Sequence, residues 1–281
     1  WSKNSFFSFT VQLLNNIIEP MFQTAKKKIT SSKIYSKPFP YLFLKNFLNS
    51  KDVVRINKDL PSFKEVEGTE ILYQSKSKTK KTLLPSSPIY KKLIKKKSFK
   101  EINFLFKKLQ PIILKKFAKE IKKHVKTEHQ NKKLNYHSSY SVMRSGYKKS
   151  AHLDRRDHLI HMIMYPFSQH QNGGEICINS VKKKEKVYDI FPEKKDLKIF
   201  KKHKVHSNSC IIILNVPWAY HSVSKYNGSK DRKYFYMVYD FPVKKQGSKI
   251  ANRKKGFNQN DFWNFKVKVK SEKRRKIFLK E

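Results

Sequence analysis

Cysteine and long apolar runs are scarce in this sequence. The chain has 281 residues but only two cysteines, Cys177 and Cys210, and no CxxC pair, which excludes a zinc site built on such pairs. Both cysteines lie in apolar segments that we expect to be strands, so we predict two buried thiols in a reducing, cytoplasmic compartment. No run approaches the roughly 18 apolar residues that cross a bilayer, so we expect no transmembrane segment. The sequence begins at Trp1, which leaves open whether it is a fragment.

Acidic residues are also scarce, and the chain is strongly basic. It carries 64 Lys and Arg against 21 Asp and Glu, a formal net charge of +43. Such a charge suits a polyanion, so one hypothesis is a non-catalytic basic β-barrel that binds nucleic acid or another polyanion. Lysine greatly outnumbers arginine, however, whereas selective phosphate binding favours the bidentate arginine fork. We therefore interpret most of the charge as composition of the kind that an AT-rich genome produces.

The first half of the chain is divided into helices, a strand and a loop. In chain order, we expect a helix over Ser5–Phe22 that ends near Pro20, a basic linker over Lys26–Lys37, a strand over Tyr41–Phe47, a helix capped at Asn49 or Ser50, and a surface loop or hairpin over Thr69–Leu84. Pro85–Val125 should be helical, and Pro111 should break it into two helices. Apolar residues at four-residue steps should pack this region on a sheet: Ile113, Phe117, Ile121 and Val125.

From Leu134 the apolar period changes to two, which is typical of strands. The expected strands are Tyr136–Arg144, Leu159–Tyr165, Glu175–Ser180, Lys186–Phe191, a segment around Lys204–Val205, Cys210–Asn215 and Lys233–Phe241. Short strands of this kind favour an antiparallel sandwich or barrel inside an α+β fold with a mainly β core. Asn172–Gly174 should form a turn with positive φ. A basic extension follows, and its aromatic cluster should dock on the domain rather than stack bases: Phe257, Phe262, Trp263 and Phe265.

The stretch Ala151–Phe167 carries the strongest chemical signal. Residues i and i+2 of an extended chain face the same side, so His152 and Asp154 can offer an imidazole and a carboxylate to one metal ion. His221, which follows a second apolar run, is the best third ligand. Two histidines and one carboxylate form the ligand set of non-heme Fe(II) oxygenases, in which open positions accept cosubstrate and oxygen.

Two alternatives stay open for these residues. His152 and Asp154 can instead form a solvated pair in a surface loop. A rival site consists of Asp154, His158 and His161 on one face of a helix, where they could hold zinc. The β-formers of Leu159–Tyr165 favour a strand over that helix.

The motifs HLD, NGGE, AYHSV and DRKYFYMVYDF, in this order, resemble the 2-oxoglutarate- and Fe(II)-dependent dioxygenases, particularly their prolyl-hydroxylase-like branch. The resemblance covers roughly Lys37–Val243, with specific motifs from about Tyr140 to Phe241. It implies a double-stranded β-helix, a jelly-roll or cupin-like barrel, over about 134–243 within a dioxygenase domain of 37–245. The segments 1–36 and 246–281 would then be an N-terminal helix with its linker and a basic C-terminal extension.

The resemblance also implies roles for individual residues. His152, Asp154 and His221 would bind Fe(II), and Arg232 in the next strand would grip the far carboxylate of 2-oxoglutarate. Tyr165 and Arg144 are further candidates for cosubstrate binding. O2 is the oxidant, and ascorbate is a further cofactor found with this family. The expected reaction hydroxylates an unactivated C–H bond of a protein side chain, an amino acid or a sugar, with succinate and CO2 as coproducts.

Two positions narrow the reaction type within the resembled superfamily. The carboxylate of Asp154 favours hydroxylation, because related halogenating enzymes have a small residue there. Val238 stands where oxidative nucleic-acid demethylases carry a second arginine, which argues against that subclass.

Overall fold

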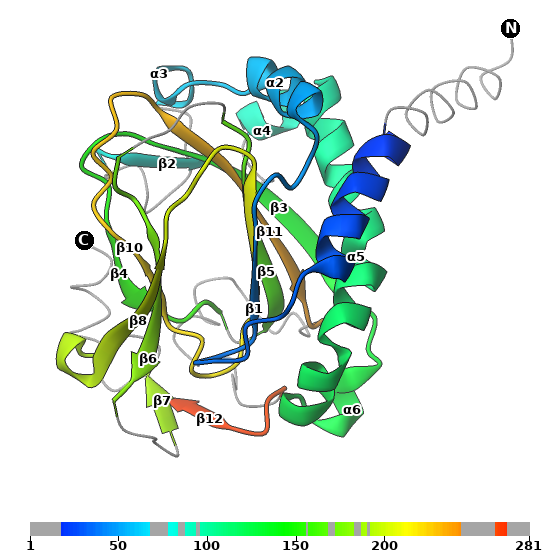
Figure 1. Ribbon diagram of the computed structural model, residues 1–281, viewed down its shortest axis with the longest axis vertical. Helices are drawn as coiled ribbons and strands as arrows, with labels where there is room; N and C mark the ends of the chain where they lie inside the picture. Colours follow the sequence, from blue (N-terminus) through cyan, green and yellow to red (C-terminus); the bar gives the residue numbers. More distant parts are fainter. Residues whose placement is uncertain are drawn as a thin grey trace, which may run out of the picture.

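Two antiparallel sheets lie face to face and form the core, with helices along the outer side of the larger sheet (Figure 1). The structure is a computed structural model that describes residues 18–67, 78–83, 88–93, 96–155, 157–167, 172–182, 187–189, 192–242 and 262–268. The larger sheet has the spatial order β1 (Tyr41–Leu44), β9 (Ser209–Leu214), β5 (His158–Tyr165), β11 (Arg232–Asp240), β3 (Asn135–Met143) and β2 (Lys80–Leu83). The smaller sheet has the order β4 (Lys149–His152), β10 (His221–Val223), β6 (Ile176–Val181) and β8 (Leu197–His203). This α+β arrangement with a jelly-roll-like core confirms the expected fold class.

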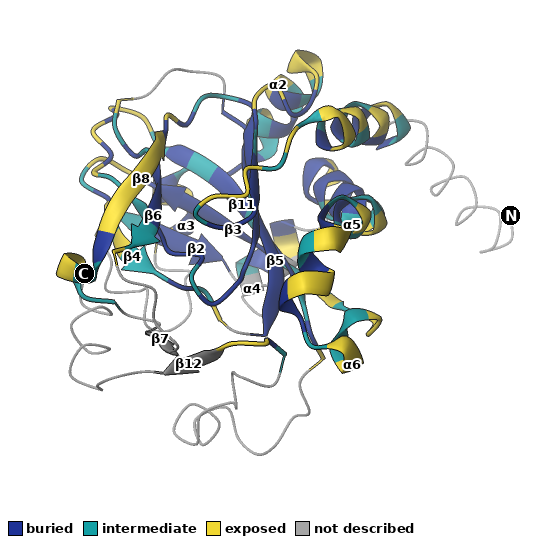
Figure 2. Cartoon of the chain, turned by 60° about the horizontal axis from the view of Figure 1, so that its bottom comes forward, coloured by how far each residue is buried: buried dark blue, intermediate teal, exposed yellow. Residues whose placement is uncertain are grey.

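Both faces of the larger sheet are buried, because helices cover one face and the smaller sheet covers the other (Figure 2). Strands buried on both faces become continuous apolar runs, and β9 with its sequence SCIIIL is the clearest case. Alternate residues of β11 therefore face opposite layers. Its odd-numbered residues Phe235 and Met237 join the apolar core, whereas Arg232, Tyr234 and Tyr236 face the smaller sheet, where the candidate site lies.

The helices are α2 (Ser50–Asp59), α3 (Phe63–Val66), α4 (Pro88–Leu93), α5 (Lys97–His124) and α6 (Thr127–Gln130), with a further helix over 18–31. The helix 18–31 runs along α5 (Figure 1). An ion pair between Lys108 and Glu19 and a 2.8 Å hydrogen bond from Lys116 Nζ to the carbonyl of Thr30 join the two helices. The linker expected from residue 26 is therefore wrong as far as residue 31, because this segment is helical and packed. Most of the expected helix over Ser5–Phe22 lies outside the described residues.

Helix α5 continues through Pro111, so the predicted break at this residue is wrong. Proline removes one backbone hydrogen bond and costs about 3 kcal/mol inside a helix. Pro111 is exposed, and the apolar stripe continues on both sides of it, with Leu109 and Ile113 fully buried against the sheet. Burial of such a side chain contributes roughly 1.5–3 kcal/mol, so the stripe as a whole outweighs one proline. The predicted cap of α2 is confirmed, because Asn49 accepts a hydrogen bond from the backbone N–H of Asp52.

The sequence predicts most of the long strands within two residues of their observed ends. It includes β2 only within the surface loop or hairpin expected over Thr69–Leu84, because Lys80 and Lys81 made this segment look exposed. The strand expected around Lys204–Val205 is displaced, since β8 ends at His203. The expected strand Lys186–Phe191 is present as β7 (Val187–Asp189). Its parallel partner β12 (Lys266–Lys268) and the short strands β4 and β10 were not expected. These strands are too short to show a period of two.

The cysteines and the C-terminal aromatic residues behave as expected. Cys177 in β6 and Cys210 in β9 are free, buried thiols. Trp263 is 1% exposed, and the ring of Phe262 stacks on Phe241 with centroids 4.5 Å apart. This cluster therefore docks on the domain, whereas Phe257 lies outside the described residues. Among the described helices, none has the length and apolar character that crossing a bilayer requires.

Candidate metal centre

The pairing of two short strands brings His152 and His221 together. His152 is the last residue of β4 and His221 is the first of β10, and the two are direct partners in the antiparallel register. Such partners have Cβ atoms roughly 4.5–5.5 Å apart and side chains on the same face. The two imidazole rings accordingly have centroids 4.5 Å apart. Backbone pairing thus places the two ligands, which lie far apart in the sequence.

Asp154 completes the group from the segment that follows β4. Its Oδ1 lies 3.8 Å from Nε2 of His152, and its Oδ2 lies 3.7 Å from Nε2 of His221. The three residues each offer a ligand atom, and these atoms lie within 4.8 Å of one another. The structure therefore brings together the three ligands predicted from the sequence.

Hydrogen bonds orient both imidazoles for metal binding. Nδ1 of His152 lies 2.9 Å from the carbonyl of Ser150, and Nδ1 of His221 lies 3.1 Å from the carbonyl of Ala219. A carbonyl only accepts, so each Nδ1 carries the proton in these bonds. Each Nε2 then presents its lone pair toward Asp154. A histidine bonded to a carbonyl through one nitrogen is the usual arrangement of a metal ligand.

The protonation states of His152 and Asp154 also favour the binding of a cation. Burial, with a further contribution from His221, lowers the pKa of His152 to about 3, so this imidazole is neutral at pH 7. Burial alone would raise the pKa of Asp154, but His161, His221, His152 and His158 together hold it well below its usual range. A neutral imidazole and an ionised carboxylate are the protonation states that ligate metals. The residues therefore fit a divalent metal ion.

Side chains of the larger sheet surround Asp154 on its other side. The hydroxyl of Tyr236 donates to Asp154 Oδ2 at 3.1 Å and lies 3.4 Å from Nδ1 of His158. Nδ1 of His161, a fully buried residue, lies 3.1 Å from the same Oδ2. The sequence placed His158 and His161 only in the rival zinc site on a helix. The observed strand removes that helix, yet His161 does approach Asp154.

A β-bulge explains why both histidines face inward. In the pairing of β5 with β11, Tyr239 lies opposite Ile160 and Asp240 lies opposite His158, so Leu159 is the extra residue. Positions 158 and 161 would otherwise face opposite sides of the strand. A bulge redirects one side chain, and bulges are common next to functional sites. The sequence offers no signal that would locate this bulge.

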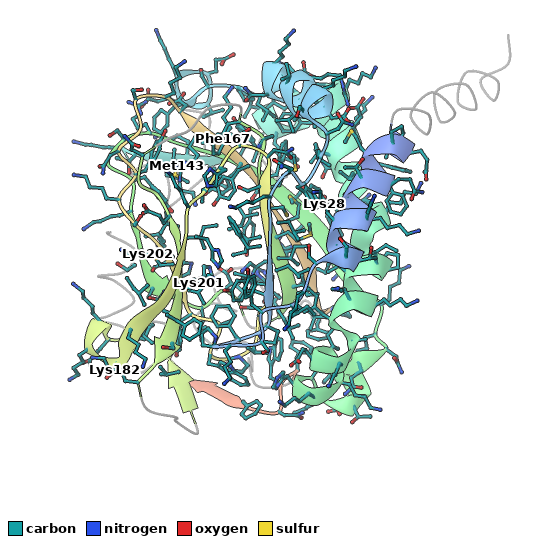
Figure 3. The ribbon with its side chains drawn as sticks, viewed as in Figure 1. Lys28, Met143, Phe167, Lys182, Lys201 and Lys202 are labelled. Atoms are coloured by element: carbon teal, nitrogen blue, oxygen red, sulfur yellow. The ribbon has the colours of Figure 1, made fainter. Side chains whose placement is uncertain are left out.

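Arg232 lies fully buried at the start of β11, where it is the register partner of Met143 in β3. Its guanidinium lies 5.7 Å from the ring centre of Phe167, and Figure 3 labels both of these neighbours. Its Nη1 donates to the carbonyl of Gly174 at 2.7 Å and its Nη2 donates to the carbonyl of Gly173 at 2.9 Å. Both glycines have positive φ, as expected for this turn. The turn therefore holds the guanidinium in addition to joining two strands.

Tyr165 belongs to the same region as Arg232, whereas Arg144 does not. Tyr165 is 3% exposed, and burial raises its pKa while the charge of Arg232 opposes this increase. Arg144 is largely exposed, with its guanidinium 3.4 Å from the centre of the Phe63 ring. Arg144 therefore lies apart from the residues that could bind a cosubstrate. A strand position before the HLD motif was too weak a signal to place it.

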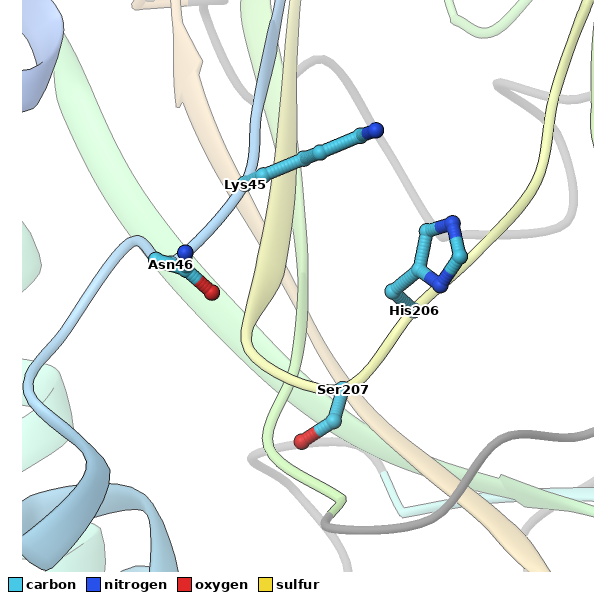
Figure 4. Close-up of a pocket in the computed structure, with 4 residues that line it drawn as sticks. All are labelled: Lys45, Asn46, His206 and Ser207. Carbon is cyan, nitrogen blue, oxygen red and sulfur yellow. The ribbon is translucent and has the colours of Figure 1, made fainter.

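A surface pocket of about 320 Å³ contains none of these residues. Lys45 and Asn46 line it from the end of β1, and His206 and Ser207 line it from the loop between β8 and β9 (Figure 4). The pocket is open to solvent and offers no donor set comparable to that of His152, Asp154 and His221. We therefore place the candidate chemistry between the sheets and not in this pocket.

Comparisons with known proteins give similarities in structure only. No family model and no curated protein sequence matches the chain. A prolyl 4-hydroxylase of Pseudomonas putida is 9% identical, covers 79% of this chain and 100% of its own, and has a TM-score of 0.45. A viral collagen prolyl hydroxylase from Paramecium Bursaria Chlorella virus-1, in a 2-oxoglutarate complex, is 13% identical, covers 72% and 96%, and has a TM-score of 0.42.

A prolyl hydroxylase of Trichoplax adhaerens, in complex with a hypoxia inducible factor peptide fragment, is 10% identical, covers 83% and 92%, and has a TM-score of 0.46. At these identities and scores the similarities carry no functional argument, which must come from the residues of the site. The solved structures that the chain resembles are prolyl hydroxylases and 2-oxoglutarate–Fe(II) oxygenases, the group that its sequence motifs resemble.

Proposed function

We propose that this chain is a 2-oxoglutarate- and Fe(II)-dependent dioxygenase that hydroxylates an unactivated C–H bond, and that residues 37–245 form its catalytic domain. The observation that carries the proposal is the group of His152, Asp154 and His221, whose donor atoms converge from two strands and the following segment. Two imidazoles and a carboxylate on one side of a metal leave positions for cosubstrate and oxygen.

The proposed reaction converts the substrate, 2-oxoglutarate and O2 into the hydroxylated product, succinate and CO2. A bound metal would activate O2, the oxidant, and 2-oxoglutarate would supply two electrons as it is oxidised to succinate and CO2, a chemistry that no protein side chain provides. His152, Asp154 and His221 hold the metal, while Tyr236 holds the carboxylate of Asp154 in place.

The other end of the cosubstrate requires a cation deeper between the sheets. Arg232 and Tyr236 are four residues apart on β11, roughly 13 Å of strand, and both face the smaller sheet. A short dicarboxylate between them would meet the metal at one end and the guanidinium at the other. Tyr165 would donate a further hydrogen bond, and the buried aromatic residues around it exclude water from the oxidation. The substrate class stays open among a protein side chain, an amino acid and a sugar.

The experiment measures metal binding and succinate release separately. Wild-type protein should bind one Fe(II) under anaerobic conditions and, with 2-oxoglutarate and O2, should release succinate slowly even without substrate. His221→Ala should lose both properties, because it removes one of three ligands. His206→Ala is the matched control, since His206 lines the surface pocket and should leave both unchanged. Wild-type protein that binds no Fe(II) would refute the proposal.

A further inference from the structure

A second cation faces the space that contains Arg232. Lys80, the first residue of β2, is the register partner of Met143 in β3, which is in turn the partner of Arg232. Direct partners share a face of the sheet, so Lys80 faces the same side as Arg232. The next inward position supports this assignment, because Thr82 Oγ1 lies 2.8 Å from Ser141 Oγ on that face. Two strand spacings separate the backbones of the two cations, roughly 10 Å.

The ammonium group of Lys80 lies among tyrosine rings. Its Nζ is 5.6 Å from the ring centres of both Tyr147 and Tyr234. The ring of Tyr234 lies 5.6 Å from that of Tyr165. Burial raises the pKa of Tyr147 to about 12, and the charge of Lys80 opposes this increase. The part-buried Lys80 therefore lies among residues that also border Arg232.

Aromatic side chains lie next to both Lys80 and Arg232. The guanidinium of Arg232 lies 4.3 Å from the ring centre of Tyr226 and 5.7 Å from that of Phe167. We call this region the aromatic chamber, and its walls are Tyr147, Tyr165, Phe167, Tyr226 and Tyr234. None of these five side chains is more than 7% exposed. Charges inside such walls interact more strongly than charges in water.

Charged groups of both signs lie around Arg232. Burial lowers the pKa of Arg232, which shows that its ionised form is poorly solvated there. Glu175 opposes this shift weakly, and its own carboxylate is engaged by the hydroxyl of Ser224. A guanidinium and an ammonium group on the same face of the sheet can both donate charged hydrogen bonds to one carboxylate ligand. Tyrosine hydroxyls at the same place can donate hydrogen bonds to such an anion.

We propose that Lys80 is a second cation for the far carboxylate of the cosubstrate, and that Lys80 and Arg232 together select a dicarboxylate over a monocarboxylate 2-oxo acid. The inference rests on the proposed function, since it assumes that a 2-oxo acid occupies the metal centre. The turn at Gly173 and Gly174 fixes the guanidinium of Arg232, whereas the longer reach of Lys80 from an edge strand lets the ammonium follow the ligand.

The test compares the binding of two 2-oxo acids to the 281-residue chain loaded with Mn(II), which prevents turnover. 2-Oxoglutarate reaches the metal and the chamber, whereas pyruvate reaches only the metal. In Lys80→Gln we expect a 10- to 100-fold weaker affinity for 2-oxoglutarate by calorimetry, with pyruvate and Mn(II) affinities within twofold of wild type. Lys80→Arg should retain most of the affinity. Lys78→Gln, an exposed lysine just before β2, should match wild type.

Each result has a defined meaning once circular dichroism shows that the variants are folded. Equal 2-oxoglutarate affinity in wild type and Lys80→Gln would overturn the role of Lys80 and leave the dioxygenase proposal intact. A loss in Lys80→Arg as large as that in Lys80→Gln would also overturn it, because charge would not be the cause. Wild-type protein that binds Mn(II) but no 2-oxoglutarate would instead overturn the proposed function.

Discussion

Gly174→Ala should disturb Arg232 and thereby separate cosubstrate binding from metal binding. A Cβ atom built on Gly174 would lie 2.2 Å from Nη1 of Arg232, well inside van der Waals contact. The guanidinium would have to leave its place between the turn and the ring of Tyr226. The metal ligands lie on other strands and should keep their geometry.

The expected loss of unfolding free energy in Gly174→Ala has a contribution from the backbone and one from the side chain of Arg232. Alanine at a φ of +65° costs roughly 1–2 kcal/mol, because a left-handed conformation brings its Cβ close to a carbonyl. Displacing the guanidinium breaks charged hydrogen bonds to two carbonyls, each worth roughly 1.5–3 kcal/mol. We therefore expect the free energy of unfolding to fall by about 4–8 kcal/mol, with a 10-fold or larger rise in the Kd of 2-oxoglutarate.

Gly146→Ala is the matched control for this prediction. Gly146 also has a positive φ of +90°, but its added Cβ would only touch Cγ2 of Thr79 at 3.4 Å. This control should lose roughly 1–2 kcal/mol of stability and keep its affinity for 2-oxoglutarate. Urea denaturation and calorimetry on the Mn(II)-loaded proteins measure both quantities. Equal losses in the two variants, with unchanged 2-oxoglutarate binding, would refute the reasoning about Arg232.

Three further predictions concern the surroundings of the metal centre and the C-terminal segment. Tyr236→Phe removes the hydrogen bond to Asp154 and should weaken Mn(II) binding roughly 10-fold in a calorimetric titration, while an unchanged Kd would exclude this supporting role. His152 and His158 both have a pKa of about 3 because burial disfavours their charged forms. The unfolded chain therefore binds more protons between pH 6.5 and 3, so metal-free protein should lose stability as pH falls from 6.5 toward 3 in urea denaturation; a flat profile would contradict this. Trp263→Ala should cost about 3–5 kcal/mol of unfolding free energy, and a loss below 1 kcal/mol would mean that the segment does not dock in solution.

The three candidate metal ligands could be predicted because their sequence signals are local or nearly so. The HxD pattern alone predicts that His152 and Asp154 face the same side, since alternate residues of an extended chain share a face. His221 follows a buried run whose end is visible in the sequence, and Arg232 opens the next strand. The register that makes His152 and His221 direct partners was not predictable, because it depends on the pairing of two very short strands. The motif order therefore predicted the three residues that come together but not the strand register that brings them there.

The orientation of Lys80 could not be predicted, because it lies in a lysine-rich segment. In the stretch KSKTKKTLL every lysine looks like a solvated surface residue, so the segment that contains β2 was predicted as a surface loop or hairpin. Because β2 pairs with β3, Lys80 faces the same side of the sheet as Arg232. Lys81, one residue later, faces the opposite side, where its Nζ lies 5.8 Å from the ring centre of Phe63. Net charge alone cannot distinguish these two environments.

The bulge at Leu159 has a comparable effect on the histidines of β5. It places His158 and His161 on the inner face together with Tyr236, so side chains of the larger sheet contact the carboxylate of Asp154, whereas Nε2 of His152 and of His221 lies 3.7–3.8 Å from it. The ligands themselves come from the smaller sheet and the segment after β4. Under the proposed function, metal binding would therefore depend on the spacing of the two sheets, because the candidate donors lie in or next to the smaller sheet and Tyr236 of the larger sheet contacts the carboxylate of Asp154. Changes to the packing between the sheets should consequently affect metal affinity even where no ligand is altered.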